Sequence, residues 1–121
     1  MKALTTNAEI EHVLTINAAV LVLFGGAHCG VCQAIKAPLE NLIGDEFPQM
    51  VSVYVDCEQN SGQACASRGI FTSPVVQIWF EGQRFGEFVR VFSLGDIRTS
   101  IERPYRALFA EPDQQSNNRS N

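Results

Sequence analysis

The chain has 121 residues, of which 45% are hydrophobic and 18% are charged, and its nine basic and thirteen acidic side chains give a formal net charge of −4. This length suits one compact domain with its own core and is too short for two. The mild acidic balance argues against general nucleic-acid binding, which needs clustered Lys and Arg, and against a polybasic membrane surface.

The chain shows no sign of a membrane span or a secretory signal. The best apolar run, residues 18–24, is far shorter than the roughly 18 residues that a span needs. Residues 1–15 contain Glu9 and Glu11 and no apolar core of a signal peptide, so we expect a cytoplasmic protein. In that compartment, four cysteines favour redox chemistry or metal binding over a structural disulfide framework.

Two elements open the chain, a short helix and a buried strand. The spacing of Ile10, Val13 and Leu14 predicts an amphipathic helix over residues 7–14, capped by Thr5, Thr6 or Asn7. Residues 19–24 form a continuous apolar run. Such a run without polar alternation predicts a strand that is buried on both faces, as in a parallel sheet.

The later elements alternate between helix and strand and end in a hairpin. Periodicity predicts helices over 29–43 and 61–68, a strand over 50–56, and strands over 75–81 and 84–92 that flank a turn at Gly82-Gln83. Ser93 and Asp96 form a capping box that opens a last helix, which Pro104 is expected to end or bend.

The order αβαβαββα predicts an α/β fold in which a mixed central sheet of four to five strands is flanked by helices. We expect one domain over residues 1–109. Residues 110–121 are polar, lack apolar periodicity and are predicted to form a disordered tail.

The segment Cys29-Gly-Val-Cys32 lies where the first strong strand passes into a helix. Two cysteines three residues apart on a first helical turn can close a disulfide with little backbone movement. The helix N-terminus carries a partial positive charge that stabilises a thiolate, which is the nucleophilic form of cysteine. We therefore predict that Cys29, nearer the exposed end, attacks a substrate disulfide, and that Cys32 resolves the mixed disulfide.

From about Asn7 to Phe109 the chain resembles the thioredoxin family. The resemblance rests on the apolar strand before Cys29, on the CxxC motif, and on Pro38, Asp56, Thr72-Ser73-Pro74, Phe80-Glu-Gly82 and Ser93-Leu-Gly95. It implies a thioredoxin fold, a cis peptide bond before Pro74, and a substrate peptide that pairs with the backbone of Ser73. It also implies exchange with protein disulfides in cell redox homeostasis, an upstream reductant, and no cofactor.

Several positions depart from the family pattern. His28 stands where the family usually has Trp, Leu23 replaces a buried Asp that moves protons for the resolving thiol, and Arg90 replaces a small Gly that lines the substrate groove. We predict that His28 and Arg90 belong to the substrate-binding residues, together with Ser73 and Pro74. A protonated His28 would favour the Cys29 thiolate, and the alternative is an exposed loop residue without a role.

Cys57 and Cys65 lie outside the CxxC motif. We favour buried, inert thiols for them, with a regulatory disulfide or an intermolecular contact as alternatives. A zinc or iron–sulfur site built from all four cysteines is disfavoured because the second pair is not a CxxC, so we predict no metal site.

The sequence thus predicts a thiol–disulfide oxidoreductase of thioredoxin fold, with Cys29 and Cys32 as catalytic residues. The alternative is a thioredoxin-fold binding or assembly module with little redox turnover. Leu23 and Arg90 favour the alternative because both remove features on which ordinary turnover relies.

Overall fold

The computed structural model describes residues 1–58 and 62–110. Its elements in chain order are β1 (Lys2–Leu4), α1 (Asn7–Ile16), β2 (Ala19–Gly25), α2 (Gly30–Glu46), β3 (Val51–Asp56), α3 (Gly62–Ser67), β4 (Val75–Phe80), β5 (Gln83–Val89) and α4 (Leu94–Phe109). The predicted tail falls, from residue 111 onward, outside the described residues. No helix in the described ranges is long and apolar enough to cross a membrane.

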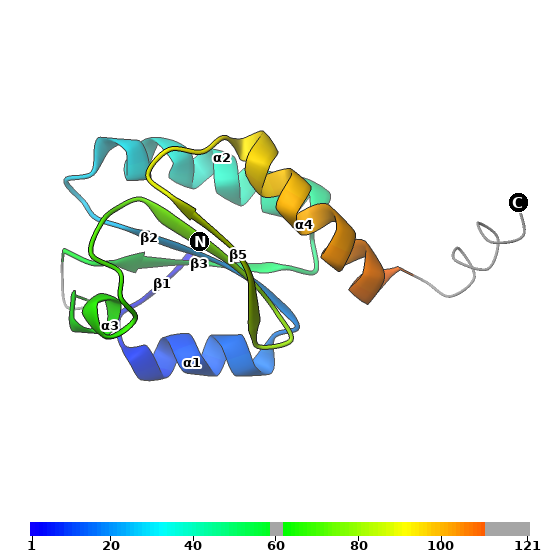
Figure 1. Cartoon of the computed structure of the whole chain (residues 1–121), viewed down its shortest axis with the longest axis horizontal. Coiled ribbons are helices and arrows are strands. Elements are labelled where there is room, and N and C mark those ends of the chain that lie inside the picture. Colours follow the sequence, from blue (N-terminus) through cyan, green and yellow to red (C-terminus); the bar gives the residue numbers. More distant parts are fainter. Residues whose placement is uncertain (59–61, 111–121) are drawn as a thin grey trace, which may run out of the picture.

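The five strands form one mixed sheet in the order β1-β3-β2-β4-β5. β1 and β2 run parallel to β3, whereas β4 is antiparallel to both of its neighbours. Helices α2 and α4 cover one face, and α1 and α3 cover the other (Figure 1). This arrangement confirms the predicted α/β fold with a mixed sheet flanked by helices.

The central strand β2 is buried on both faces, as its uninterrupted apolar sequence predicts. Because side chains alternate along a strand, Leu21 and Leu23 point into the core under α2 and α4, while Val22 and Phe24 point into the core over α1. β2 therefore packs between two hydrophobic cores, which hold its carboxyl end in a fixed position.

Two expectations about the elements are corrected. The predicted order lacks β1, which comes before α1 and makes the order βαβαβαββα. Its three residues are too few for a periodic signal, and pairing with β3 forms the strand. Of the two outcomes expected at Pro104, an end or a bend, the end is wrong, because α4 continues to Phe109.

The hairpin turn lies one residue earlier than predicted. Glu81 and Gly82 occupy it, with φ values of 51° and 75°, and Phe80 pairs with Gln83. Two positive φ values are what a two-residue hairpin turn requires at its centre. The predicted helix caps are present: Thr6 forms a capping box with Glu9, and Ser93 forms one with Asp96.

Cys57 and Cys65 form a disulfide, so the favoured interpretation of inert thiols is wrong. Cys57 follows β3 and the buried Cys65 lies in α3. A helix of six residues is too short to be stable by itself. The disulfide therefore fastens α3 to the end of β3. Through α3 it also holds the segment that leads to Ser73.

We predict that opening this disulfide lowers the free energy of unfolding by about 2–3 kcal/mol, because a cross-link of this loop length restricts the unfolded chain by that amount. The measurement uses the C29S/C32S variant, in which dithiothreitol can reduce only Cys57–Cys65. Urea unfolding is compared with and without the reductant. Equal midpoints, with reduction verified by mass, would show that the cross-link does not stabilise the fold.

Candidate functional site

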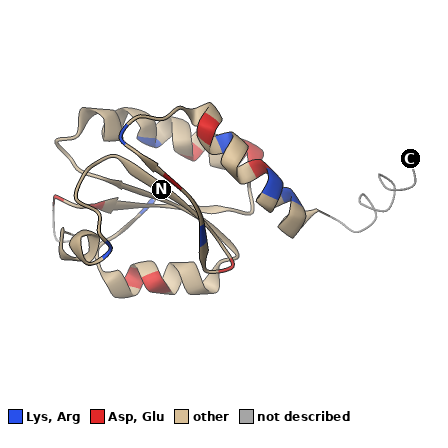
Figure 2. Ribbon diagram, in the orientation of Figure 1, with Lys and Arg blue, Asp and Glu red and all other residues tan. Residues whose placement is uncertain are grey.

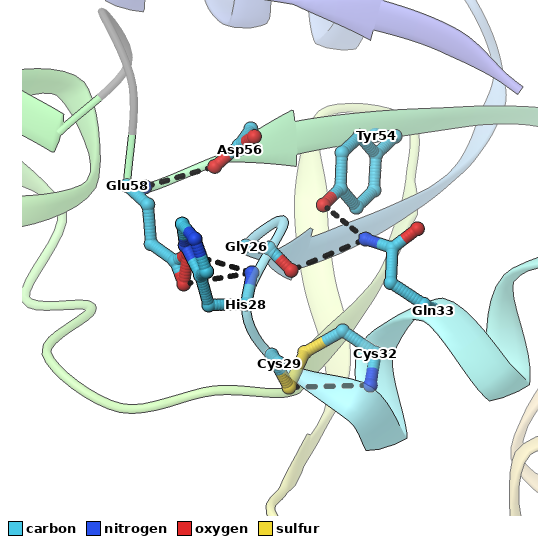
Figure 3. A network of polar contacts seen from close by, with 8 residues as sticks. All are labelled: Gly26, His28, Cys29, Cys32, Gln33, Tyr54, Asp56 and Glu58. Carbon is cyan, nitrogen blue, oxygen red and sulfur yellow. Dashed lines mark hydrogen bonds and ion pairs between the residues drawn. A yellow bond between two sulfur atoms is a disulfide. The ribbon is translucent and has the colours of Figure 1, made fainter.

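The predicted catalytic cysteines lie where β2 passes into α2. Cys29 and Cys32 form a disulfide with their Cα atoms 5.2 Å apart (Figure 3). Cys29 is the N-cap of α2, and its Sγ accepts a hydrogen bond from the backbone N–H of Cys32 at 3.2 Å. Cys32 is fully buried whereas Cys29 is half-buried. The sulfur at the helix N-terminus is therefore the one that another molecule can reach.

Cys32 packs directly on Gly25, the last residue of β2. A Cβ atom at Gly25 would lie 2.9 Å from the Cβ of Cys32 and 3.1 Å from its Sγ. Any larger residue would push the buried cysteine away from the sheet, so this close approach requires glycine at position 25.

The pairing of the strands places the cis proline beside this contact. The Ser73–Pro74 peptide bond is cis, as the resemblance implied. Phe24 pairs with Val75 in antiparallel register, so the next position brings Gly25 level with Pro74. On the other side of Pro74, its carbonyl accepts a hydrogen bond of 2.8 Å from the backbone N–H of Arg90.

The residues next to the disulfide offer unused backbone groups and apolar side chains. Ser73 is half-buried, and within the described part of the chain its backbone N–H and C=O make no hydrogen bond. Three apolar side chains on three segments near the disulfide are strongly exposed: Val31 (55%), Phe71 (81%) and Val91 (93%). We call these three residues the apolar rim. Val31 lies between the two cysteines, Phe71 two residues before Ser73 and Val91 next to Arg90. Exposed apolar side chains thus flank the residues of the site, as on many protein-binding surfaces.

Glu58 is a site residue that the sequence did not reveal. Its carboxylate accepts a hydrogen bond from the backbone N–H of His28 at 2.9 Å and lies 3.1 Å from His28 Nδ1 (Figure 3). The first of these bonds is the main reason that the pKa of Glu58 lies below its ordinary value. Glu58 follows no motif and is 30 residues away from His28, so only the folded chain brings the two together.

The carboxylate of Glu58 lies across Gly26, where a Cβ atom would collide with it. Gly26 in turn accepts hydrogen bonds through its carbonyl from the backbone of Cys29 and from the side chain of Gln33, both at 3.1 Å. Together these contacts fix the loop that carries Cys29. The ring of His28 is 91% exposed and lies on the outer side of this loop.

On β2, two residues before Gly25, the side chain is apolar where the resemblance implies a buried carboxylate. Leu23 is fully buried, and Tyr54 is its partner on β3. The hydroxyl of Tyr54 accepts a hydrogen bond of 3.3 Å from Gln33, and Lys36 Nζ lies 4.3 Å from the centre of the Tyr54 ring. Burial, and then the charge of Asp56, raise the pKa of Tyr54. Tyr54 therefore stays protonated at neutral pH and is no base for Cys32.

Comparison with known proteins agrees with this geometry. A family model described as Thioredoxin matches residues 2–103. The chain is 24% identical over 97 residues to "Thioredoxin-like 3-2, chloroplastic" of Arabidopsis thaliana, a match that covers 77% of this chain and 50% of that protein. The chain thus spans about half the length of this relative.

Solved thioredoxins share the fold. The structure of Fasciola hepatica thioredoxin is 26% identical and superposes with a TM-score of 0.74, covering 85% of this chain and 98% of the other. Plasmodium falciparum thioredoxin, at 19% identity, gives a TM-score of 0.74 over 85% of this chain and 99% of the other. The family model covers most of the chain, and the chain belongs to the thioredoxin family.

Proposed function

We propose that this protein exchanges the Cys29–Cys32 dithiol and disulfide with disulfides in partner proteins. The observation that carries the proposal is the placement of a disulfide at the start of α2, packed on Gly25 and level with the cis Pro74. Family membership supports thiol–disulfide oxidoreductase chemistry in general. That the substrates are disulfides in partner proteins is part of what we propose.

The reaction takes two steps. The Cys29 thiolate attacks one sulfur of the client disulfide, so that a Cys29–client bond forms while the other client sulfur leaves and takes up a proton. The Cys32 thiolate then attacks Cys29 Sγ, which closes the Cys29–Cys32 disulfide and releases the second client thiol. Two electrons pass to the client, and an upstream dithiol reductant restores the pair. An oxidised pair meeting a client dithiol runs the same steps in reverse.

The cis-proline segment supplies the client-binding surface. The backbone N–H and C=O of Ser73, which make no hydrogen bond within residues 1–58 and 62–110, can pair with an extended client segment, which is a common mode of peptide recognition. The apolar rim of Val31, Phe71 and Val91 can cover apolar client side chains. Because Leu23 gives Cys32 no buried base, deprotonation of Cys32 has to use water, His28 or another group, and we expect slow resolution of the mixed disulfide.

A second candidate function is a binding or assembly module with little turnover. The apolar surroundings of Leu23 favour it, since they hold no proton carrier for Cys32. The two functions differ in whether a client is released: a module would hold its client even when Cys29 and Cys32 are both replaced by Ala. A cytoplasmic location also stays a proposal, because the Arabidopsis relative is named chloroplastic.

We expect Cys29→Ser to abolish the reduction of insulin disulfides, because the only half-exposed sulfur of the motif is lost. Cys32→Ser should instead accumulate a mixed disulfide between Cys29 and the client, visible by mass spectrometry under non-reducing conditions. Circular dichroism checks that both variants fold. Full insulin reduction by the Cys29→Ser variant would refute the mechanism.

The bond between Glu58 and His28 predicts a pH dependence of stability. Because folding lowers the pKa of Glu58 below 4.5, its contribution is fully present above about pH 4.5 and is lost as the pH falls through the lowered value. We expect wild type to be more stable than Glu58→Gln at pH 7 and the difference to shrink below pH 4. Urea midpoints at pH 7, 5, 4 and 3 measure this, with Glu102→Gln on α4 as the control. A difference that is the same at every pH would contradict the assignment.

A further inference from the structure

Arg90 has a backbone conformation that its residue type disfavours. Its φ is 65°, in the left-handed region where L residues other than Gly, Asn and Asp are uncommon. In the described ranges, Glu81 is the other residue besides glycine with a positive φ, and the hairpin turn accounts for it. Arg90 is the centre of a three-residue turn, because the backbone N–H of Val91 donates a hydrogen bond of 2.8 Å to the carbonyl of Val89. A three-residue turn with a positive φ at its centre is rare and strained. Strained residues of this sort gather at binding and catalytic sites.

The strained residue lies against the client-binding surface. Val75 pairs with Val89, and the next bond along runs from Arg90 N–H to the carbonyl of Pro74. Gly25, Pro74 and Arg90 therefore form a row across one end of the sheet, at the ends of the neighbouring strands β2, β4 and β5. Neighbouring strands are spaced about 4.8 Å apart. The backbone of Arg90 is therefore roughly 5 Å from the backbone of Pro74 and roughly 10 Å from the backbone of Gly25, on which Cys32 packs.

The guanidinium of Arg90 is available to a partner. Arg90 is exposed, and within residues 1–58 and 62–110 it forms no ion pair. By contrast, Arg68, Arg84 and Arg98 each pair with a glutamate of the same chain. The backbone of Arg90 lies beside that of Pro74, and the positive charge of its exposed side chain is not neutralised by an ion pair within the described protein.

Opposite charges stand at the other end of the same row. Asp56 pairs with Gly25 on its far side, and Glu58 follows two residues later. Figure 2 shows red just past β3 and blue on the connection between β5 and α4, where Arg90 is the one basic residue in the sequence 90–93. A client that crosses this row meets acidic groups at the β3 end and a cation at the β5 end.

We propose that Arg90 determines client specificity by selecting disulfides that have an Asp or Glu side chain close to the reacting cysteine. The inference rests on the proposed function and names its client class. A carboxylate on the β5 side of Pro74 would form a charge-assisted pair with the guanidinium, whereas a Lys there would meet like charge. Because a positive φ favours glycine, Arg at position 90 carries a backbone cost that glycine would not.

The test uses disulfide-linked peptide pairs that are identical except for Glu, Gln or Lys, placed on either side of the reacting cysteine. The readout is the ratio of kcat/KM for the Glu and Lys peptides, which does not depend on overall activity. We expect wild type to prefer the Glu peptide by about three- to tenfold when the varied residue stands on at least one side of the reacting cysteine. This range lies between the effect of a solvent-exposed ion pair and that of a partly buried one. The preference should weaken as salt is raised.

Three variants separate charge from backbone effects. Arg90→Gly, which suits the positive φ, should bring the ratio close to one, and Arg90→Glu should reverse it toward Lys. Arg103→Glu, the same charge change on an exposed residue of α4, should leave the wild-type ratio intact. An unchanged ratio in both Arg90 variants, or an equal shift in Arg103→Glu, would overturn the proposal.

Binding separates a failure of this inference from a failure of the proposed function. The same peptides with Ser in place of Cys are titrated into the C29S/C32S variant and followed by fluorescence anisotropy. Tighter binding of the Glu peptide that disappears with Arg90→Gly supports the role of Arg90 even if wild type shows no turnover. Equal binding of the Glu and Lys peptides contradicts it even if wild type reduces both.

Discussion

The contact between Cys32 and Gly25 is the constraint on which the rest of the site depends. It fixes the start of α2 on the carboxyl end of β2, because a Cβ atom at Gly25 would displace the buried sulfur. β2 is itself held between two cores and pairs with β3 and β4. The Cys29–Cys32 disulfide, the cis Pro74 and Arg90 therefore all lie at the same end of the sheet as the carboxyl end of β2.

Much of this could be predicted from the sequence because local patterns carry it. The apolar run of β2 predicts a buried central strand, and the cysteine spacing at a strand-to-helix junction predicts the reactive pair. The cis bond before Pro74 came from the family resemblance and is confirmed. Leu23 could be identified as an apolar substitution for a buried carboxylate, and the structure buries it completely.

The remaining features depend on contacts between distant parts of the chain. β1 has three residues and forms only because β3 offers it a parallel edge. Glu58 reaches His28 across 30 residues and carries no motif. The pairing of Cys57 with Cys65 depends on where α3 packs against the end of β3, which periodicity does not report. The positive φ of Arg90 depends on how the chain turns after β5.

Reversible closure of the Cys29–Cys32 disulfide tests the central claim most directly. The protein is equilibrated in glutathione or dithiothreitol redox buffers, alkylated, and the state of each cysteine is read by mass. The account predicts a single two-electron transition for this pair. A midpoint near about −270 mV would indicate a reductant, and one above about −200 mV would indicate an oxidant or isomerase. A pair that stays as thiols in every buffer would contradict the redox function and leave the binding module as the better account.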